Sequence, residues 1–175
     1  SIDAITAIIE TQEGRVLAGS YAVGIFEIDP KNFAARLHGT RPGQPGSLDD
    51  SRITGLVIDP GGGLVASTWG GGLQRTSFST RQFGRLDSFV DATGLPVELQ
   101  DVLAVAGNAD TGIWVGSNSR GLMRLSDQDD GLKALPYPIG DPSRPPAVFS
   151  VRPESADRIW VGLADGLLDY RPGVL

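Results

Sequence analysis

The sequence predicts an all-β protein built from β-propeller blades, each a sheet of four antiparallel strands, with about four repeats. Two observations predict this fold. A β-branched and apolar run, followed by a Gly-rich turn and a second short run, occurs four times, at residues 14–28, 62–75, 111–125 and 158–169. Equivalent positions lie 48, 49 and 46 residues apart, at Gly19, Ser67, Gly116 and Gly162. That period, with short strands and Gly-rich turns, is typical of propeller blades.

The first repeat shows how the strands arise from the residues. Residues 5–10 are β-branched and apolar, and a turn containing Gly joins them to residues 15–20, which form the hairpin partner. Residues 24–29 supply the third strand. Pro30 interrupts the chain before a fourth strand, which we expect at residues 33–38.

The later repeats have the same plan. The four blades are expected at residues 5–38, 53–88, 101–136 and 147–171. Their remaining strands are expected at residues 53–58, 63–68, 72–77, 83–88, 101–106, 112–117, 121–126, 132–136, 147–152, 158–163 and 166–171. The fourth blade has no fourth strand. A connector rich in Pro, Gly and Asp, residues 39–51, is expected to cross from the outer strand of the first blade to the inner strand of the second.

Strands with apolar residues on both faces indicate sheets that stack on their neighbours. Four blades in an open arc would leave two terminal faces bare. A closed ring of four blades, a partial ring completed by a second copy of the chain, and one part of a larger propeller remain open. The missing fourth strand favours the last two, so we expect a partial propeller. Because the chain begins with Ser1 rather than Met, we expect it to be a piece of a longer protein.

The composition bounds the class of protein. A chain of 175 residues with 40% hydrophobic residues suits a single domain, residues 1–175, with a packed core. Its formal net charge of −6 opposes nucleic-acid binding, so we expect no nucleic-acid partner. It has no cysteine, and therefore no disulfide or thiolate metal site. No apolar run approaches the roughly 20 residues that cross a bilayer, so we expect no membrane segment in this chain.

Several motifs match one family of repeats. Residues 47–56 (S-L-D-D-S-R-I-T-G-L) match its opening loop and inner strand, and residues 59–64 (D-P-G-G-G-L) match its turn. Its opening G-L-P, its central I-W-V-G strand and the G-L segment after that strand are matched at residues 94–96, 113–116, 159–162, 71–73 and 121–122. Over nearly its whole length the chain resembles the two-component regulator propeller repeats. It departs from them in the first repeat, which has no Trp, and at Ser67, where Gly is typical.

The resemblance implies the periplasmic sensor region of a bacterial hybrid two-component or diguanylate cyclase sensor. Such a region is the non-catalytic ectodomain of an inner-membrane sensor. It would bind a small molecule or oligosaccharide and pass ligand occupancy to a downstream kinase or cyclase outside this chain. Its other partners would be the remaining blades or a second copy of the chain. Two alternatives remain: a protein-interaction scaffold, and a polysaccharide lyase or glycosidase propeller.

Aromatic residues supply the candidate site. Trp114 and Trp160 occupy equivalent places in the second strand of their blades, where a large side chain fills the gap between blades. The turns between second and third strands lie on one face of a propeller, around its channel, where exposed rings suit stacking on a ligand. We therefore predict ligand-binding residues in these turns, at Tyr21, Trp69, Asn118, Arg120 and Asp165. The alternative is that the aromatic residues cap the hairpin or pack on the next blade.

We predict no catalytic residue, no cofactor and no metal site. Residues 127–131 (D-Q-D-D-G) lack the ligand spacing and the final Glu of a calcium loop. His38 is the only histidine, so the chain cannot build a histidine metal cluster, and we expect His38 to be a surface residue. Asp49 and Asp50 could in principle act as an acid and a base, but the sequence does not predict the distance between them.

Overall fold

The structure is a computed structural model that describes residues 3–77, 82–86, 89–90, 95–128 and 131–173. Over these residues the chain contains strands and turns and no helix, which confirms the all-β prediction. Sheet one contains β1 (Ile5–Glu10), β2 (Val16–Ser20), β3 (Gly24–Ile28) and β4 (Ala35–His38). Sheet two contains β5 (Ile53–Ile58), β6 (Gly63–Thr68), β7 (Gly72–Ser77) and β8 (Gly84–Arg85).

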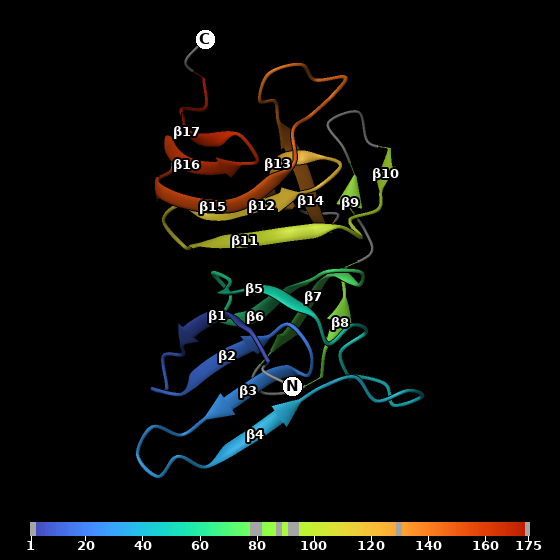
Figure 1. The fold of residues 1–175 in the computed structure, drawn as a ribbon, viewed down its shortest axis with the longest axis vertical. Coiled ribbons are helices and arrows are strands. Elements are labelled where there is room, and N and C mark those ends of the chain that lie inside the picture. The colour runs from blue at the N-terminus through green and yellow to red at the C-terminus, as the bar shows by residue number, and fades with distance from the viewer. Residues whose placement is uncertain (1–2, 78–81, 87–88, 91–94, 129–130, 174–175) are drawn as a thin grey trace.

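Sheets three and four repeat this topology. Sheet three contains β11 (Val102–Asn108), β12 (Gly112–Ser117), β13 (Gly121–Gln128) and β14 (Gly131–Tyr137). Sheet four contains β15 (Val148–Ser155), β16 (Arg158–Leu163) and β17 (Gly166–Tyr170). In each sheet the strands pair antiparallel in chain order, and the sheets stack from sheet one at one end of the molecule to sheet four at the other (Figure 1). The arrangement is propeller-like.

The strand predictions are most accurate among the first three strands of the sheets. Six predicted strands have the observed bounds at both ends: β1, β5, β6, β7, β12 and β16. These strands begin or end at Gly-rich turns, whose backbone conformations only a few residue types adopt readily. The local sequence therefore determines their ends.

The outer strands differ from the predictions. β4 begins at Ala35 rather than at residue 33, because the Phe33 N–H donates to the Asp29 carbonyl at 2.8 Å and Phe33 itself has a φ of 57°. β8 is only two residues long, whereas a strand is predicted over residues 83–88, of which 87–88 lie outside the described residues. The short pair β9 (Phe89–Val90) and β10 (Pro96–Val97) is not predicted. Almost all residues of β4 and β8 are exposed, so burial constrains their sequences less than it constrains those of the buried strands.

Each inner strand carries the same β-bulge. The pairing with the second strand shifts by one residue between Ile5 and Ala7, Ile53 and Gly55, Val102 and Ala104, and Val148 and Ser150. In the first two sheets the bulged residue is a threonine. The Thr6 hydroxyl donates to the Ile53 carbonyl at 2.7 Å, and the Thr54 hydroxyl donates to the Val102 carbonyl at 2.9 Å. The bulge thus connects each of these inner strands to that of the next sheet.

Glycines allow the sheets to approach closely. A Cβ built on Gly19 would lie 2.6 Å from Cγ2 of Ile53, and one built on Gly116 would lie 2.6 Å from Cγ1 of Val148. Around these contacts each interface buries an apolar cluster. The main members are Leu17, Ile25, Ile53, Leu56 and Leu64 between sheets one and two; Val57, Val65, Leu73, Val102 and Val105 between sheets two and three; and Ala104, Trp114, Leu122, Val148 and Val151 between sheets three and four.

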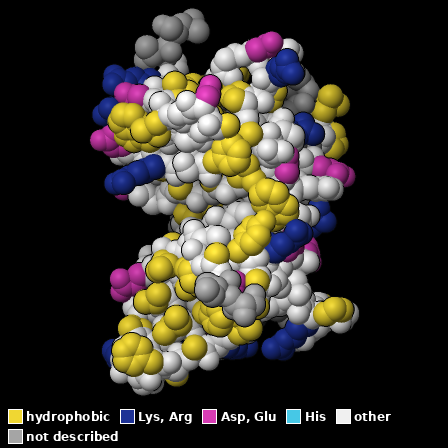
Figure 2. Space-filling model, in the orientation of Figure 1, with side chains coloured by type: hydrophobic (Ala, Val, Ile, Leu, Met, Phe, Trp, Pro, Cys, Tyr) yellow, Lys and Arg dark blue, Asp and Glu magenta, His cyan; other side chains and the backbone are white. Residues whose placement is uncertain are grey.

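The outward face of sheet one is apolar and exposed. The first residue of each inner strand faces the preceding sheet, and it is 0% exposed in Ile53, Val102 and Val148. The equivalent residue of sheet one, Ile5, is 48% exposed, and Ile8, three positions along the same strand, is 68% exposed. Figure 2 shows hydrophobic side chains gathered over this end of the molecule. Residues of a type that is buried at every interface therefore lie on the surface here.

The outward face of sheet four is exposed in the same way. Leu167 is 70% exposed, although its equivalents in the first three sheets, Ile25, Leu73 and Leu122, are at most 1% exposed. Trp114 is fully buried as predicted, and its indole N–H donates to the Thr111 carbonyl at 3.0 Å. The prediction that Trp160 is also buried in the core is wrong. Trp160 is half-buried, because no described sheet covers this face.

The two equivalent tryptophans make a matched test of the stacking. Replacing Trp114 with Ala should lower the free energy of unfolding by about 3–5 kcal/mol, because a cavity forms between sheets three and four. Trp160→Ala should cost about 1 kcal/mol, because solvent already reaches that ring. Urea unfolding followed by far-UV circular dichroism measures both. Equal losses would contradict the difference in burial.

Candidate ligand-binding site

The turns between second and third strands occupy equivalent places in the first three sheets. The backbone N–H of the first residue in each turn donates to the carbonyl of the residue just before the inner strand. These hydrogen bonds join Tyr21 to Ala4 (2.9 Å), Trp69 to Arg52 (3.0 Å) and Asn118 to Asp101 (3.0 Å). Tyr21, Trp69 and Asn118 are therefore equivalent, as predicted: each is the first residue of its own turn and makes the same backbone hydrogen bond.

A hydroxyl at the end of the second strand closes each of these turns. Oγ of Ser20 accepts hydrogen bonds from the backbone N–H groups of residues 22 and 23. Oγ of Ser117 accepts them from residues 119 and 120, and Oγ1 of Thr68 accepts one from Gly71 at 3.0 Å. In sheet four the equivalent residue is Leu163, which has no hydroxyl. The turns of the first three sheets are therefore held in related shapes by their own side chains.

Tyr21 and Trp69 meet at this edge of the stack. Their ring centroids lie 6.2 Å apart with an interplanar angle of 75°, an edge-to-face contact between sheet one and sheet two. Tyr21 is 39% exposed and Trp69 is 46% exposed. The pair combines a fixed relative orientation with open aromatic surface, which suits contact with the apolar face of a ligand.

An ion pair between Asp50 and Arg52 stabilises the turn that contains Trp69. Arg52 donates from Nε to Oδ1 of Asp50 at 3.0 Å and from Nη2 to Oδ2 at 2.8 Å, and the Gly70 N–H donates to the same Oδ2 at 2.9 Å. Burial of the Asp50 carboxylate raises its pKa. The hydrogen bonds and charge of Arg52, together with the Gly70 N–H, outweigh burial, so the pKa of Asp50 lies below its usual value. Asp50 is therefore an ionised structural group.

Two residues that are adjacent in the sequence have different surroundings. Asp49 is exposed, whereas both carboxylate oxygens of Asp50 accept hydrogen bonds from Arg52, so Asp50 is held in an ion pair. Sequence reasoning missed Arg52. The spacing D-x-R in the connector was the available signal, because a guanidinium two residues along can reach back to a carboxylate.

The other predicted residues lie in the turns of sheets three and four. Arg120 lines a groove of about 510 Å³ with Ser119, Met123, Ala134, Pro136, Pro142 and Pro145. Asn118 is exposed in the same turn as Arg120, and Asp165 is exposed in the turn of sheet four. Of the five predicted residues, the structure brings Tyr21 and Trp69 into contact and places Asn118 and Arg120 in one turn.

His38 differs from its prediction as a surface residue. Only 16% of its side chain is exposed, and its Nε2 lies 2.9 Å from Oε2 of Glu27. The reason is that β4 pairs with β3, which places Glu27 and the imidazole on one side of the sheet. In the part of the chain that the structure describes, no three His, Cys, Asp or Glu side chains gather in a group able to bind a metal ion. Nor do the described residues include a helix that could span a membrane.

No protein-family model and no curated protein matches this chain. Solved structures do match it. The extracellular domain of BT4673, a putative hybrid two-component system of B. thetaiotaomicron, aligns with a TM-score of 0.72 at 19% identity, over 97% of this chain and 24% of that chain. The extracellular domain of a second such system, BT3049, aligns with a TM-score of 0.70 at 14% identity, over 97% and 24% of the two chains.

A third similar structure is PorZ, a surface component of the type-IX secretion system of Porphyromonas gingivalis. Its TM-score is 0.69 at 17% identity, over 94% of this chain and 25% of that chain. The chain thus spans about a quarter of the length of the solved structures it matches. At these identities the likeness is one of fold. Two of the three are extracellular domains of putative hybrid two-component systems, the class of protein that the repeat motifs indicate.

The Asp50–Arg52 pair predicts a pH dependence. A carboxylate with a lowered pKa in the folded state contributes stability above its unfolded pKa, and this contribution is lost as pH falls through the folded pKa. The stability difference between the wild type and Asp50→Asn should therefore be largest near pH 6 and shrink below about pH 4. Urea unfolding across this range measures it. Asp49→Asn, which removes an exposed carboxylate next to it, is the control and should show no such trend.

Proposed function

We propose that this chain is part of the ligand-binding propeller of a bacterial sensor. The module is non-catalytic and extracytoplasmic, in the periplasm as the ectodomain of an inner-membrane protein. It passes ligand occupancy to a downstream kinase or cyclase. The observation that carries the proposal is the likeness in fold to extracellular domains of two hybrid two-component systems over 97% of the chain. Because a fold alone does not determine function, the proposal also depends on the residues of the candidate site.

The exposed terminal faces support a propeller with more blades than this chain supplies. Ile8 on sheet one and Leu167 on sheet four are of the residue types that are buried at every internal interface. Each face would be covered if a further blade packed on it as the internal sheets pack on one another. We propose that further blades of a longer chain cover these faces. A second copy of the chain is the alternative occupant.

The ligand is proposed to lie against the Tyr21–Trp69 pair. An oligosaccharide or other small molecule with a flat apolar face would stack on the exposed rings. Polar groups of the same ligand would reach the turn edge, where Arg52 is exposed beside the pair. Asn118, Arg120 and Asp165 would extend the surface along the turns of sheets three and four.

Signalling through this site requires two arrangements with different affinity for the ligand. Tyr21 and Trp69 belong to different sheets. A ligand that contacts both rings therefore favours one spacing of sheets one and two over another. The proposed output is a shift in how these blades pack against the neighbouring parts of the sensor.

A protein-interaction scaffold is the second candidate function. The exposed apolar faces favour it, because Phe149 and Leu167 on sheet four are 51% and 70% exposed. In that case the partner would be a protein, and small molecules would not bind at Tyr21 and Trp69. Saturable binding of a small molecule at the aromatic pair distinguishes the sensor from the scaffold.

Ligand binding at the aromatic pair can be tested by isothermal titration calorimetry. We expect at least one member of a panel of neutral oligosaccharides to bind saturably. Trp69→Ala should weaken that binding by about tenfold or more, because the loss of an aromatic stacking surface removes about 1.4 kcal/mol. Trp160→Ala, at a half-buried ring on a terminal face, is the control and should bind as the wild type does. Equal affinity in both variants would exclude the proposed site.

Light scattering over a concentration series tests whether the two exposed terminal faces drive association of the chain. The wild-type chain should associate reversibly, because two apolar faces lack neighbours. Ile8→Glu and Leu167→Glu should each reduce association. Phe33→Glu is the matched control, since Phe33 is 81% exposed in the loop between β3 and β4. A wild-type chain that stays monomeric at every concentration would contradict the proposal that further blades cover these faces.

A further inference from the structure

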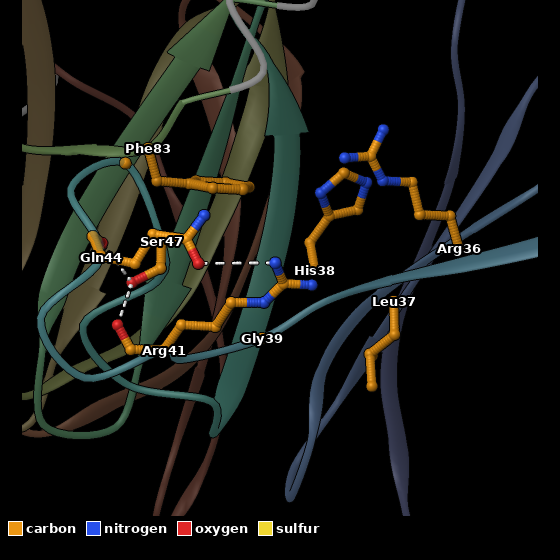
Figure 3. A pocket seen from close by; sticks show the side chains of 9 residues that line it. Arg36, Leu37, His38, Gly39, Arg41, Gln44, Ser47 and Phe83 are labelled. Atoms are coloured by element: carbon orange, nitrogen blue, oxygen red, sulfur yellow. Dashed lines mark hydrogen bonds between the residues drawn. The ribbon is translucent and has the colours of Figure 1, made fainter.

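A second polar pocket lies away from the aromatic pair, between β4, the connector at residues 39–51 and the start of β8. Figure 3 shows the side chains around it: Arg36 and His38 from β4, Arg41, Gln44 and Ser47 from the connector, and Phe83 next to β8. Its volume is about 70 Å³. None of the predicted ligand-binding residues lines it, so it is a separate pocket from the site at Tyr21 and Trp69.

The connector is held in a closed shape at this pocket. The Gln44 N–H donates to the Arg41 carbonyl at 3.0 Å, and Oγ of Ser47 lies 3.2 Å and 3.0 Å from the carbonyls of Arg41 and Gln44. The Phe83 N–H then donates to the Gly46 carbonyl at 2.9 Å, which ties the connector to sheet two. The backbone that positions Arg41 is thus preformed and needs little ordering when a ligand binds.

The imidazole of His38 is also fixed in place. Glu27 holds its Nε2 at 2.9 Å from one side. From another, the Phe83 ring meets it edge-to-face, with the ring centroids 6.2 Å apart. The pocket therefore has two preformed walls, one from β4 and one from the connector with Phe83.

Positive charge exceeds negative charge at this pocket. Two guanidinium groups, of Arg36 and Arg41, line it, and within the described ranges neither forms an ion pair with a carboxylate. The Arg41 guanidinium makes a long contact, from Nη1 to Oε1 of Gln44 at 3.5 Å. The Glu27 carboxylate, which is bound to His38 and belongs to the cross-strand partner of Arg36, brings one negative charge beside the pocket. In a chain with a net charge of −6, this is a local reversal of sign.

We propose that this pocket binds the oxyanion group of a ligand, a carboxylate or a phosphate, between Arg36 and Arg41. Planar guanidinium groups present paired N–H donors that match both kinds of oxyanion. The Ser47 hydroxyl and the Gln44 amide can supply further polar contacts at the rim. A volume of about 70 Å³ admits a single charged group and not a whole sugar ring. The site thus takes the acidic group of a ligand whose remainder lies outside.

The only histidine of the chain reports on this site directly. His38 supplies one set of imidazole C–H signals in a ¹H–¹³C NMR spectrum, and these need no assignment by mutation. Inorganic phosphate and acetate are titrated separately, at constant pH and ionic strength. For at least one anion we expect a saturable shift of the His38 signals. Arg36→Gln and Arg41→Gln should each weaken that binding by about tenfold.

The matched control is Arg144→Gln, which makes the same charge change in an exposed turn outside the pocket. It should bind the anion as the wild type does. Saturation by phosphate alone assigns the site to phosphorylated ligands, and saturation by acetate alone assigns it to acidic sugars or other carboxylates. Shifts that do not saturate, or equal affinity in Arg41→Gln and Arg144→Gln, would overturn the proposal. Urea unfolding of each variant separates lost binding from lost folding.

Discussion

The structure depends on one constraint: each sheet has two apolar faces and must cover both. The inner strand presents branched residues to the preceding sheet, and the second and third strands present theirs to the next. Glycine at position 19 or 116 lets a side chain of the next inner strand reach the backbone of the sheet before it. Burial of these faces is the main favourable contribution to the stability of a stack, because each sheet alone has too little apolar contact. The two terminal faces are where this requirement is left unmet.

Stacking also decides which residues can form a site. Tyr21 and Trp69 are far apart in the chain, yet they touch because equivalent turns of adjacent sheets lie side by side. The turns keep related shapes because a hydroxyl at their base satisfies their backbone N–H groups. Side chains on the turns are then free to differ from sheet to sheet. This is the usual division between a rigid scaffold and variable loops that carry function.

The connector between sheets one and two serves both candidate sites. Its far end contains Asp50, which binds Arg52 and the Gly70 N–H of the Trp69 turn, and its near end contains Arg41 beside His38. Both sites therefore involve the same pair of sheets. A ligand with an apolar face and a ligand with an acidic group would each act on the spacing of sheets one and two, through different ends of one segment.

The sequence by itself determined the repeat, its strands and its turns, because these arise from local alternation of apolar residues and from the backbone needs of Gly-rich turns. It also identified the aligned turn positions, from Tyr21 to Asn118. Only the tertiary structure decided burial and contact. Trp114 and Trp160 have the same local sequence, and they differ because one has a sheet stacked on it and the other does not. The Asp50–Arg52 support and the Arg36–Arg41 pocket depend in the same way on residues from different strands and segments, and strand periodicity carries no information about how these meet.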